Sequence, residues 1–122
     1  MRIDFQASDG SFEADEDALI CTLASTNADG VEHYLGFQRS LEDDNRGVHL
    51  EFDDQINGDY GRLRECRLSR GLLSVDLSEQ LGELVGVEGI DVALAIDDDL
   101  FEQIREGLHL MFRATPGVLT TA

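Results

Sequence analysis

The chain has 122 residues, enough for one domain with its own core and too few for two. Its 26 acidic residues outnumber nine basic residues, all of them arginine, and the net charge is −17. Because lysine is absent, the sequence excludes a Walker A loop, a kinase-type phosphate lysine and Schiff-base chemistry. The acidity also argues against nucleic-acid binding, which needs a basic surface.

The compartment can be inferred from the apolar segments and the cysteines. Residues 1–10, MRIDFQASDG, contain no apolar run, and no segment reaches the roughly 18 apolar residues of a membrane span. Cys21 and Cys66 each lie in a segment of alternating apolar residues. We therefore expect no secretory signal, no membrane association, two buried thiols in preference to a disulfide, and a cytoplasmic location.

Alternation of apolar and polar residues, which is typical of half-buried strands, dominates the chain. The expected strands cover residues 3–8, 19–23, 31–40, 48–53, 63–69, 72–78 and 90–96. NADG at 27–30 predicts a hairpin turn, EDDNRG at 42–47 a second polar turn, and Arg70-Gly71 a third. Residues 79–89 give no clear pattern.

The segment DDQINGDYGRLRE, residues 53–65, raises the question of a calcium loop. Asp53, Gln55, Asn57 and Gly58 fall at positions one, three, five and six of an EF-hand loop. Position twelve, which must be a glutamate, is Arg64, and strands flank the segment where the motif needs helices. We therefore interpret it as an acidic connection between strands, whose glycines allow a turn.

Near the C-terminus the apolar period becomes helical. Leu100, Ile104, Leu108 and Met111 form one stripe, and residues 97–99 supply an N-cap and negative charge at the start of the helix. The sequence therefore predicts an α+β fold: a mainly antiparallel β-sheet of about six or seven strands, with a C-terminal amphipathic helix packed on one face.

We expect a single domain over residues 1–122, in which residues 113–122 are a loosely ordered tail. Pro116 helps to stop the helix before this tail. His33 shares a face with Val31 and Leu35, so we expect a hydrogen-bonded histidine in the core or at its boundary.

Motifs for catalysis are absent. The histidines form no HExxH, the cysteines no CxxC, and no nucleophile elbow or dinucleotide fingerprint occurs. His49, Glu51 and Asp53 share the polar face of one expected strand and could bind a cation, although such a line is more often solvated surface. We expect no cofactor, no metal and no enzymatic activity.

Three parts of the sequence resemble a known family. HYLGFQRS at 33–40, VHLEFDDQINGDYGRLRECRLSRGLLSVDL at 48–77, and L…F near the end of the helix are similar to immunity protein family ten of bacterial polymorphic toxin systems. The strand ending in Gln-Arg, the Glu before FDDQ and the YG five residues later carry the likeness. The resemblance implies a mainly β protein that is encoded beside a toxin gene and inhibits that toxin by binding it. It implies no catalytic residue.

An acidic surface would suit such a role, since toxins that cut nucleic acids have basic clefts. The residues that we predict to contact the partner are Asp43, Asp44, Glu51, Asp53, Asp54, Asp59 and Tyr60. Tight binding would also need a desolvated aromatic or arginine, for which the candidates are Tyr34, Tyr60, Arg39 and Arg62. The matching positions, Tyr60-Gly61 above all, could equally serve family structure, as a packed turn.

The sequence also allows two other interpretations. One is an acidic homodimer or nucleic-acid mimic that blocks a DNA-binding partner. The other is a small metal-dependent enzyme that uses His49, Glu51 and Asp53. The charge alone could also be the solvated surface of a salt-adapted or lysine-avoiding organism.

Overall fold

The structure, a computed structural model, describes residues 1–42 and 46–121. These residues form ten strands in two five-stranded sheets, and one helix. The first sheet has the order β1 (Arg2–Ala7), β9 (Gly89–Leu94), β8 (Leu72–Leu77), β7 (Leu63–Ser69) and β10 (Leu119–Thr121). The second has the order β2 (Asp9–Ala14), β3 (Ala18–Asn27), β4 (Gly30–Ser40), β5 (His49–Phe52) and β6 (Asp54–Tyr60).

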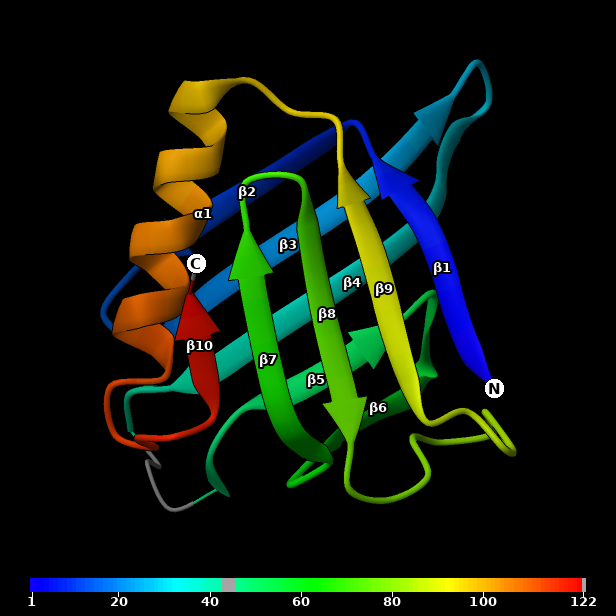
Figure 1. Ribbon diagram of the computed structural model, residues 1–122. Helices are drawn as coiled ribbons and strands as arrows, with labels where there is room; N and C mark the ends of the chain where they lie inside the picture. The colour runs from blue at the N-terminus through cyan, green and yellow to red at the C-terminus, as the bar shows by residue number, and fades with distance from the viewer. Residues whose placement is uncertain (43–45, 122) are drawn as a thin grey trace.

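The two sheets pack face to face with their strands crossing, and α1 (Asp98–Met111) lies beside the first sheet (Figure 1). The helix contacts β2 and β3 of the second sheet, where Gly107 packs against the ring of Phe12. The helix and the first sheet therefore cover the same, inner face of the second sheet. The opposite face of the second sheet points away from the core.

The apolar half of each alternating segment builds the core. In β3, Leu19, Cys21 and Leu23 are buried, whereas Ile20 and Thr22 between them are partly exposed. The same alternation buries the apolar residues of the strands in both sheets, because successive side chains of a strand point to opposite faces.

The two cysteines are buried free thiols, as predicted. Cys21 lies on β3 and Cys66 on β7, so the core takes one thiol from each sheet. Burial raises the pKa of both thiols to about 12, which keeps them protonated and unreactive at neutral pH.

The C-terminal helix forms where the sequence predicts it. Asp97 caps the helix by accepting a hydrogen bond from the Leu100 backbone N–H at 2.8 Å. The buried residues of the stripe are Phe101, Ile104, Gly107, Leu108 and Met111. Across the described residues, no helix combines the length and the apolar character needed to cross a membrane.

The α+β class, the mainly antiparallel pairing and the packed helix are confirmed. The described part of the chain nevertheless holds more strands than the six or seven expected, divided between two sheets. Alternation reveals that a segment is a strand but not which strands pair, so a single sheet and a sandwich give the same signal.

The interpretation of residues 53–65 as a connection is wrong for most of its length. Residues 54–60 form β6, an edge strand that pairs with β5. Its only aliphatic residue is Ile56, which is exposed, so β6 lacks the apolar alternation of a half-buried strand. In the expected tail, residues 119–121 pair in parallel with β7 as β10.

Candidate partner-binding surface

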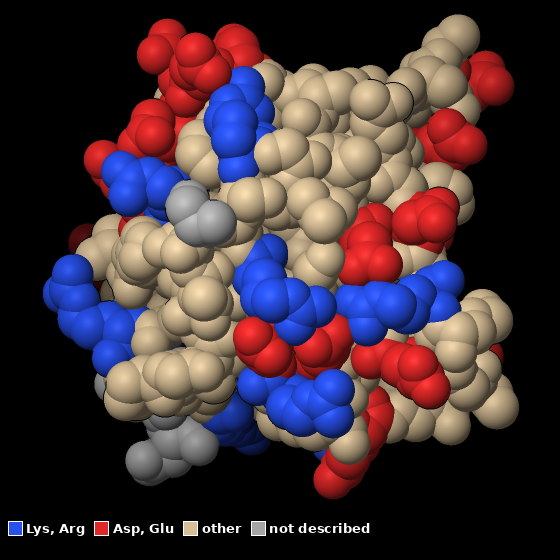
Figure 2. Space-filling model, in the orientation of Figure 1, with Lys and Arg blue, Asp and Glu red and all other residues tan. Residues whose placement is uncertain are grey.

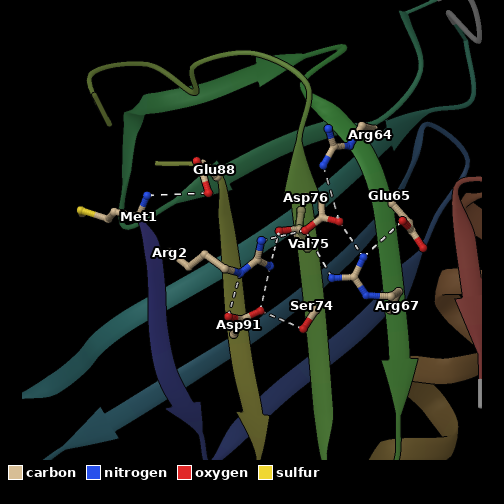
Figure 3. Close-up of polar contacts among 10 residues, drawn as sticks. All are labelled: Met1, Arg2, Arg64, Glu65, Arg67, Ser74, Val75, Asp76, Glu88 and Asp91. Atoms are coloured by element: carbon tan, nitrogen blue, oxygen red, sulfur yellow. Dashed lines mark hydrogen bonds and ion pairs between the residues drawn. The ribbon is translucent and has the colours of Figure 1, made fainter. Parts of the chain in front are cut away.

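Arginines and carboxylates neutralise one another on the outward side of the first sheet (Figures 2 and 3). Asp76 accepts hydrogen bonds from Arg67 Nη1 at 2.6 Å and from Arg2 Nη1 at 2.8 Å. Arg2 Nη2 also lies 2.9 Å from Asp91 Oδ1. The hydrogen bonds from Arg67 and Arg2 lower the pKa of Asp76 to about 2, against the opposing effect of its burial. This side therefore contributes little to the negative charge.

The excess negative charge lies closer to the second sheet. Residues 3–38, which run from β1 into β4, contain eight acidic residues and no basic residue. All eight are exposed: Asp4, Asp9, Glu13, Asp15, Glu16, Asp17, Asp29 and Glu32. Apart from Asp4 on β1 of the first sheet, these residues lie on β2 and β4 or in the turns that join β2, β3 and β4, so most of their charge belongs to the second sheet.

The outward side of the second sheet, which we call the outer face, carries two rows of residues that run across its strands. From β3 to β6, the first row consists of Thr22, Gly36, Glu51 and Gly58. Over the same four strands, the second row consists of Ile20, Gln38, His49 and Tyr60. Both neighbours of Glu51 in its row are glycines. Within the row, therefore, no side chain on β4 or β6 stands beside that of Glu51.

Tyr34 positions the Glu51 carboxylate. The Tyr34 hydroxyl on β4 donates a hydrogen bond to Glu51 Oε2 on β5, with an oxygen–oxygen distance of 2.6 Å. Burial, together with this hydrogen bond, raises the pKa of the Tyr34 phenol, so the hydroxyl stays protonated and donates. A short hydrogen bond to an ionised acceptor is among the stronger ones in proteins, and it fixes both side chains.

Tyr60, His49 and Arg46 form an aromatic and cationic stack at the edge of the outer face. The rings of His49 and Tyr60 meet edge to face, with centroids 5.0 Å apart. The guanidinium carbon of Arg46 lies 5.3 Å from the centre of the Tyr60 ring. Gly58 makes this packing possible, because a Cβ there would lie 2.8 Å from the His49 ring and 3.2 Å from Glu51 Oε1.

A recess of about 160 Å³ opens on the outer face around Gly36. Apart from Gly36 itself and its two chain neighbours, no residue has an atom within 4 Å of the position that a Cβ of Gly36 would occupy, so the missing side chain leaves open space above the strand. The side chains around it come from Ile20, Thr22, Tyr34, Gln38, His49 and Glu51. The recess thus combines one carboxylate, one phenol, one amide and one imidazole on a glycine floor.

Asp53 closes the turn between β5 and β6. Its backbone has φ = 60°, a left-handed conformation that Asp and Asn tolerate better than most residues. Its carboxylate accepts a hydrogen bond from the Tyr34 backbone N–H at 2.8 Å and lies 2.7 Å from His33 Nδ1. His33 stacks on Phe52 at the boundary of the core, as predicted. The hydrogen bond with Asp53 raises the pKa of His33.

Residues 6–102 match the family Immunity protein 10. The chain belongs to this family. The match confirms the resemblance found in the sequence, and it covers β2 to β9, including every residue that lines the recess. No curated protein sequence matches the chain.

In this member of the immunity protein 10 family, two of the predicted contact residues lie on the outer face: Glu51 beside the recess and Tyr60 in the edge stack. Asp53 supports the adjacent turn. Asp54 and Asp59 lie on β6, where Asp54 accepts the Ile56 N–H at 3.2 Å and Asp59 pairs with Arg62 at 2.9 Å. Asp43 and Asp44 lie outside the described residues.

Arg39 is not available as a binding anchor. It is 5% exposed, and its Nη1 donates a hydrogen bond to the Met111 carbonyl oxygen at 2.9 Å. The sequence carried a signal for this burial, because period-two alternation places Arg39 on the same inward side of the strand as Leu35 and Phe37. Arg62 joins Asp59 and Glu79 in ion pairs, the second at 3.0 Å.

The structure also bears on the proposed cation line of His49, Glu51 and Asp53. Asp53 pairs with His33, and Glu51 pairs with Tyr34, so the three side chains do not converge. Among residues 1–42 and 46–121, no three histidine, cysteine or acidic side chains are grouped as metal ligands.

The recess itself was missed in the sequence. Its signal is the glycine in HYLGFQRS, where alternation places Leu35 and Phe37 inward and leaves Gly36 on the outward side. A glycine inside a strand often marks a place where a ligand or another chain approaches closely. Ile20, Thr22 and Gln38 carried no signal of their own.

Proposed function

We propose that this protein binds and neutralises a cognate bacterial toxin encoded beside it, and that it does so by stoichiometric binding without catalysis. Membership of the immunity protein 10 family supports an immunity role. The observation that supports a binding surface on the outer face is the recess, which Tyr34, His49 and Glu51 line and which Tyr60 flanks.

The composition of the outer face suits a protein partner. Aromatic residues with limited side-chain freedom are the usual anchors of tight interfaces. Tyr34 and Tyr60 are both partly exposed, and each is held in place by a neighbour, Glu51 or His49. Such anchors lose little conformational entropy when the partner binds.

The charge of the outer face and its surroundings suits a basic partner. The acidic residues of 3–38 and the carboxylates of β6 lie around or beside the second sheet, whereas the carboxylates of the first sheet are largely paired with arginine. Long-range attraction would therefore guide a basic toxin towards the second sheet and raise its association rate.

Co-expression with the product of the neighbouring gene tests this function. We expect the neighbouring protein alone to arrest growth, and co-expression of this protein to restore growth and to yield a complex that co-purifies. The proposal fails if the neighbouring product is harmless and does not co-purify. Replacement of Glu51 by Arg should abolish rescue, because it reverses the charge at the centre of the outer face. Replacement of Glu88 by Arg, an exposed acid next to the N-terminus, is the matched control.

A further inference from the structure

We propose that the recess around Gly36 receives one arginine side chain of the bound toxin, which stacks along Tyr34 and pairs with Glu51. This inference rests on the proposed function and names the group that the outer face recognises.

The recess has room for an inserted side chain of the partner, in addition to contacts at its surface. The floor is the backbone of Gly36, and open space lies above it where other residues of the strand carry side chains. Thr22 and Glu51 flank Gly36 in the same row, on β3 and β5. A long, thin side chain from a partner could enter between them and reach the strand itself.

The Glu51 carboxylate is oriented but not saturated. Its Oε2 accepts the Tyr34 hydroxyl at 2.6 Å, and its Oε1 lies on the side of Gly58. An ionised carboxylate offers about four acceptor positions, so one hydrogen bond from Tyr34 leaves room for donors of a ligand. The described residues that line the recess include no arginine to neutralise Glu51.

These features select the ligand by its chemistry. An anion would face the Glu51 charge, and an apolar group would desolvate that carboxylate without a hydrogen bond. A divalent metal would find one carboxylate and one imidazole, too few ligands for a site. A guanidinium group is planar, presents five donors, pairs with carboxylates and stacks on aromatic rings, so it matches both Glu51 and Tyr34.

Filling the recess tests the inference without disturbing the fold. In Gly36→Val the new side chain enters open space, and a β-branched residue favours a strand, so the variant should remain folded. Gly71→Val is the matched control, because Gly71 also has open space at its Cβ position and lies in the turn between β7 and β8 of the other sheet. Glu51→Gln removes the charge while an amide oxygen remains to accept from Tyr34.

Isothermal titration calorimetry measures the affinity of each variant for the toxin encoded by the neighbouring gene. We expect Gly36→Val and Glu51→Gln to weaken the wild-type affinity at least tenfold, and Gly71→Val to change it less than twofold. A double-mutant cycle of Glu51→Gln against each arginine of the toxin should find one coupled arginine. Unchanged affinity in Gly36→Val, or no coupled arginine, overturns the inference and leaves the immunity role intact.

A small probe tests the recess independently of the toxin. Nα-acetyl-arginine amide, added to ¹⁵N-labelled protein, should shift the backbone amide signals of residue 36 and of Glu51 in the wild type and should shift neither signal in Gly36→Val. The neutral isostere Nα-acetyl-citrulline amide should leave them unshifted. If the toxin does not bind the wild type, the proposed function fails, and the titration alone then tests the arginine site. The arginine inference is overturned if neither probe shifts these signals, or if both probes shift them equally.

Discussion

The Tyr34 hydroxyl donates a hydrogen bond of 2.6 Å to the Glu51 carboxylate, and this bond joins β4 to β5 on the outer face. The pair joins two chain segments, 33–40 and 48–77, that carry the family resemblance. It holds a negative charge beside an open recess, and it makes the phenol of Tyr34 a structural donor as well as a candidate contact.

Removing the Tyr34 hydroxyl should therefore cost both stability and binding. In Tyr34→Phe we expect the free energy of unfolding to fall by about 1 kcal/mol, because a hydrogen bond to a charged acceptor is lost at a partly exposed site. Urea denaturation measures this change. Tyr60→Phe is the control, since within the described residues the Tyr60 hydroxyl makes no hydrogen bond, and equal losses in the two variants would contradict the role of the pair.

The arginine–carboxylate network of the first sheet predicts acid sensitivity. The pKa of Asp76 is lowered from 3.8 to about 2, so its stabilising effect is fully present above pH 4 and is lost as the pH falls towards 2. Asp76→Asn should lower the free energy of unfolding at pH 7 by about 2 kcal/mol. It should also flatten the decline in stability between pH 4 and pH 2. Denaturation of both proteins across this range measures the effect, and parallel curves would exclude it.

His33 should titrate at a higher pH than an ordinary histidine. Its pKa is raised from 6.5 chiefly by the hydrogen bond with Asp53. The stabilisation is thus present below pH 6.5 and is lost as the pH rises through the folded pKa. NMR titration of the imidazole signals should give a lower pKa in Asp53→Asn. Asn tolerates the left-handed backbone at this position, so the variant tests the charge and not the turn, and an unchanged pKa would refute the assignment.

Gly107 should be required for the helix to pack on the second sheet. A Cβ at Gly107 would approach the Phe12 ring to 2.3 Å, well inside van der Waals contact. Gly107→Ala should therefore destabilise the protein by about 1–3 kcal/mol through overpacking, although alanine is the better helix former. Glu106→Ala, at an exposed neighbouring position, should be nearly neutral in the same thermal unfolding experiment.

Association with a basic toxin should depend on charge near β6. The double variant Asp54→Lys, Asp59→Lys should slow association several-fold at low salt and little at high salt, because screening removes the long-range attraction. Glu88→Lys with Glu106→Lys, at two positions outside β6, changes the net charge equally and is the control in stopped-flow measurements. Equal slowing by both pairs would assign the effect to net charge alone.

The sequence predicted the elements whose pattern is strong. The alternation around Leu19, Cys21 and Leu23 identified β3, and the stripe from Leu100 to Met111 together with the Asp97 cap identified the helix. These signals are local, and tertiary packing agrees with them.

Features that depend on pairing across the chain could not be predicted. Edge strand β6 has no apolar alternation, and β10 is only three residues long. The recess requires β3, β4 and β5 to lie side by side so that Thr22, Gly36 and Glu51 fall in one row. Asp53 was placed with Glu51 by alternation, but its left-handed backbone turns it towards His33.

Binding through the outer face is tested most directly by the affinity of this protein for the toxin encoded by the neighbouring gene, compared with the affinities of Tyr34→Ala, Tyr60→Ala and a control variant on the first sheet. Leu72→Ala is that control, since Leu72 is an exposed apolar residue of β8. Binding through the outer face predicts that each tyrosine variant loses tenfold or more in affinity and that Leu72→Ala binds as the wild type does. Full affinity in both tyrosine variants, with weakened binding in Leu72→Ala, would place the interface on the first sheet and contradict this account.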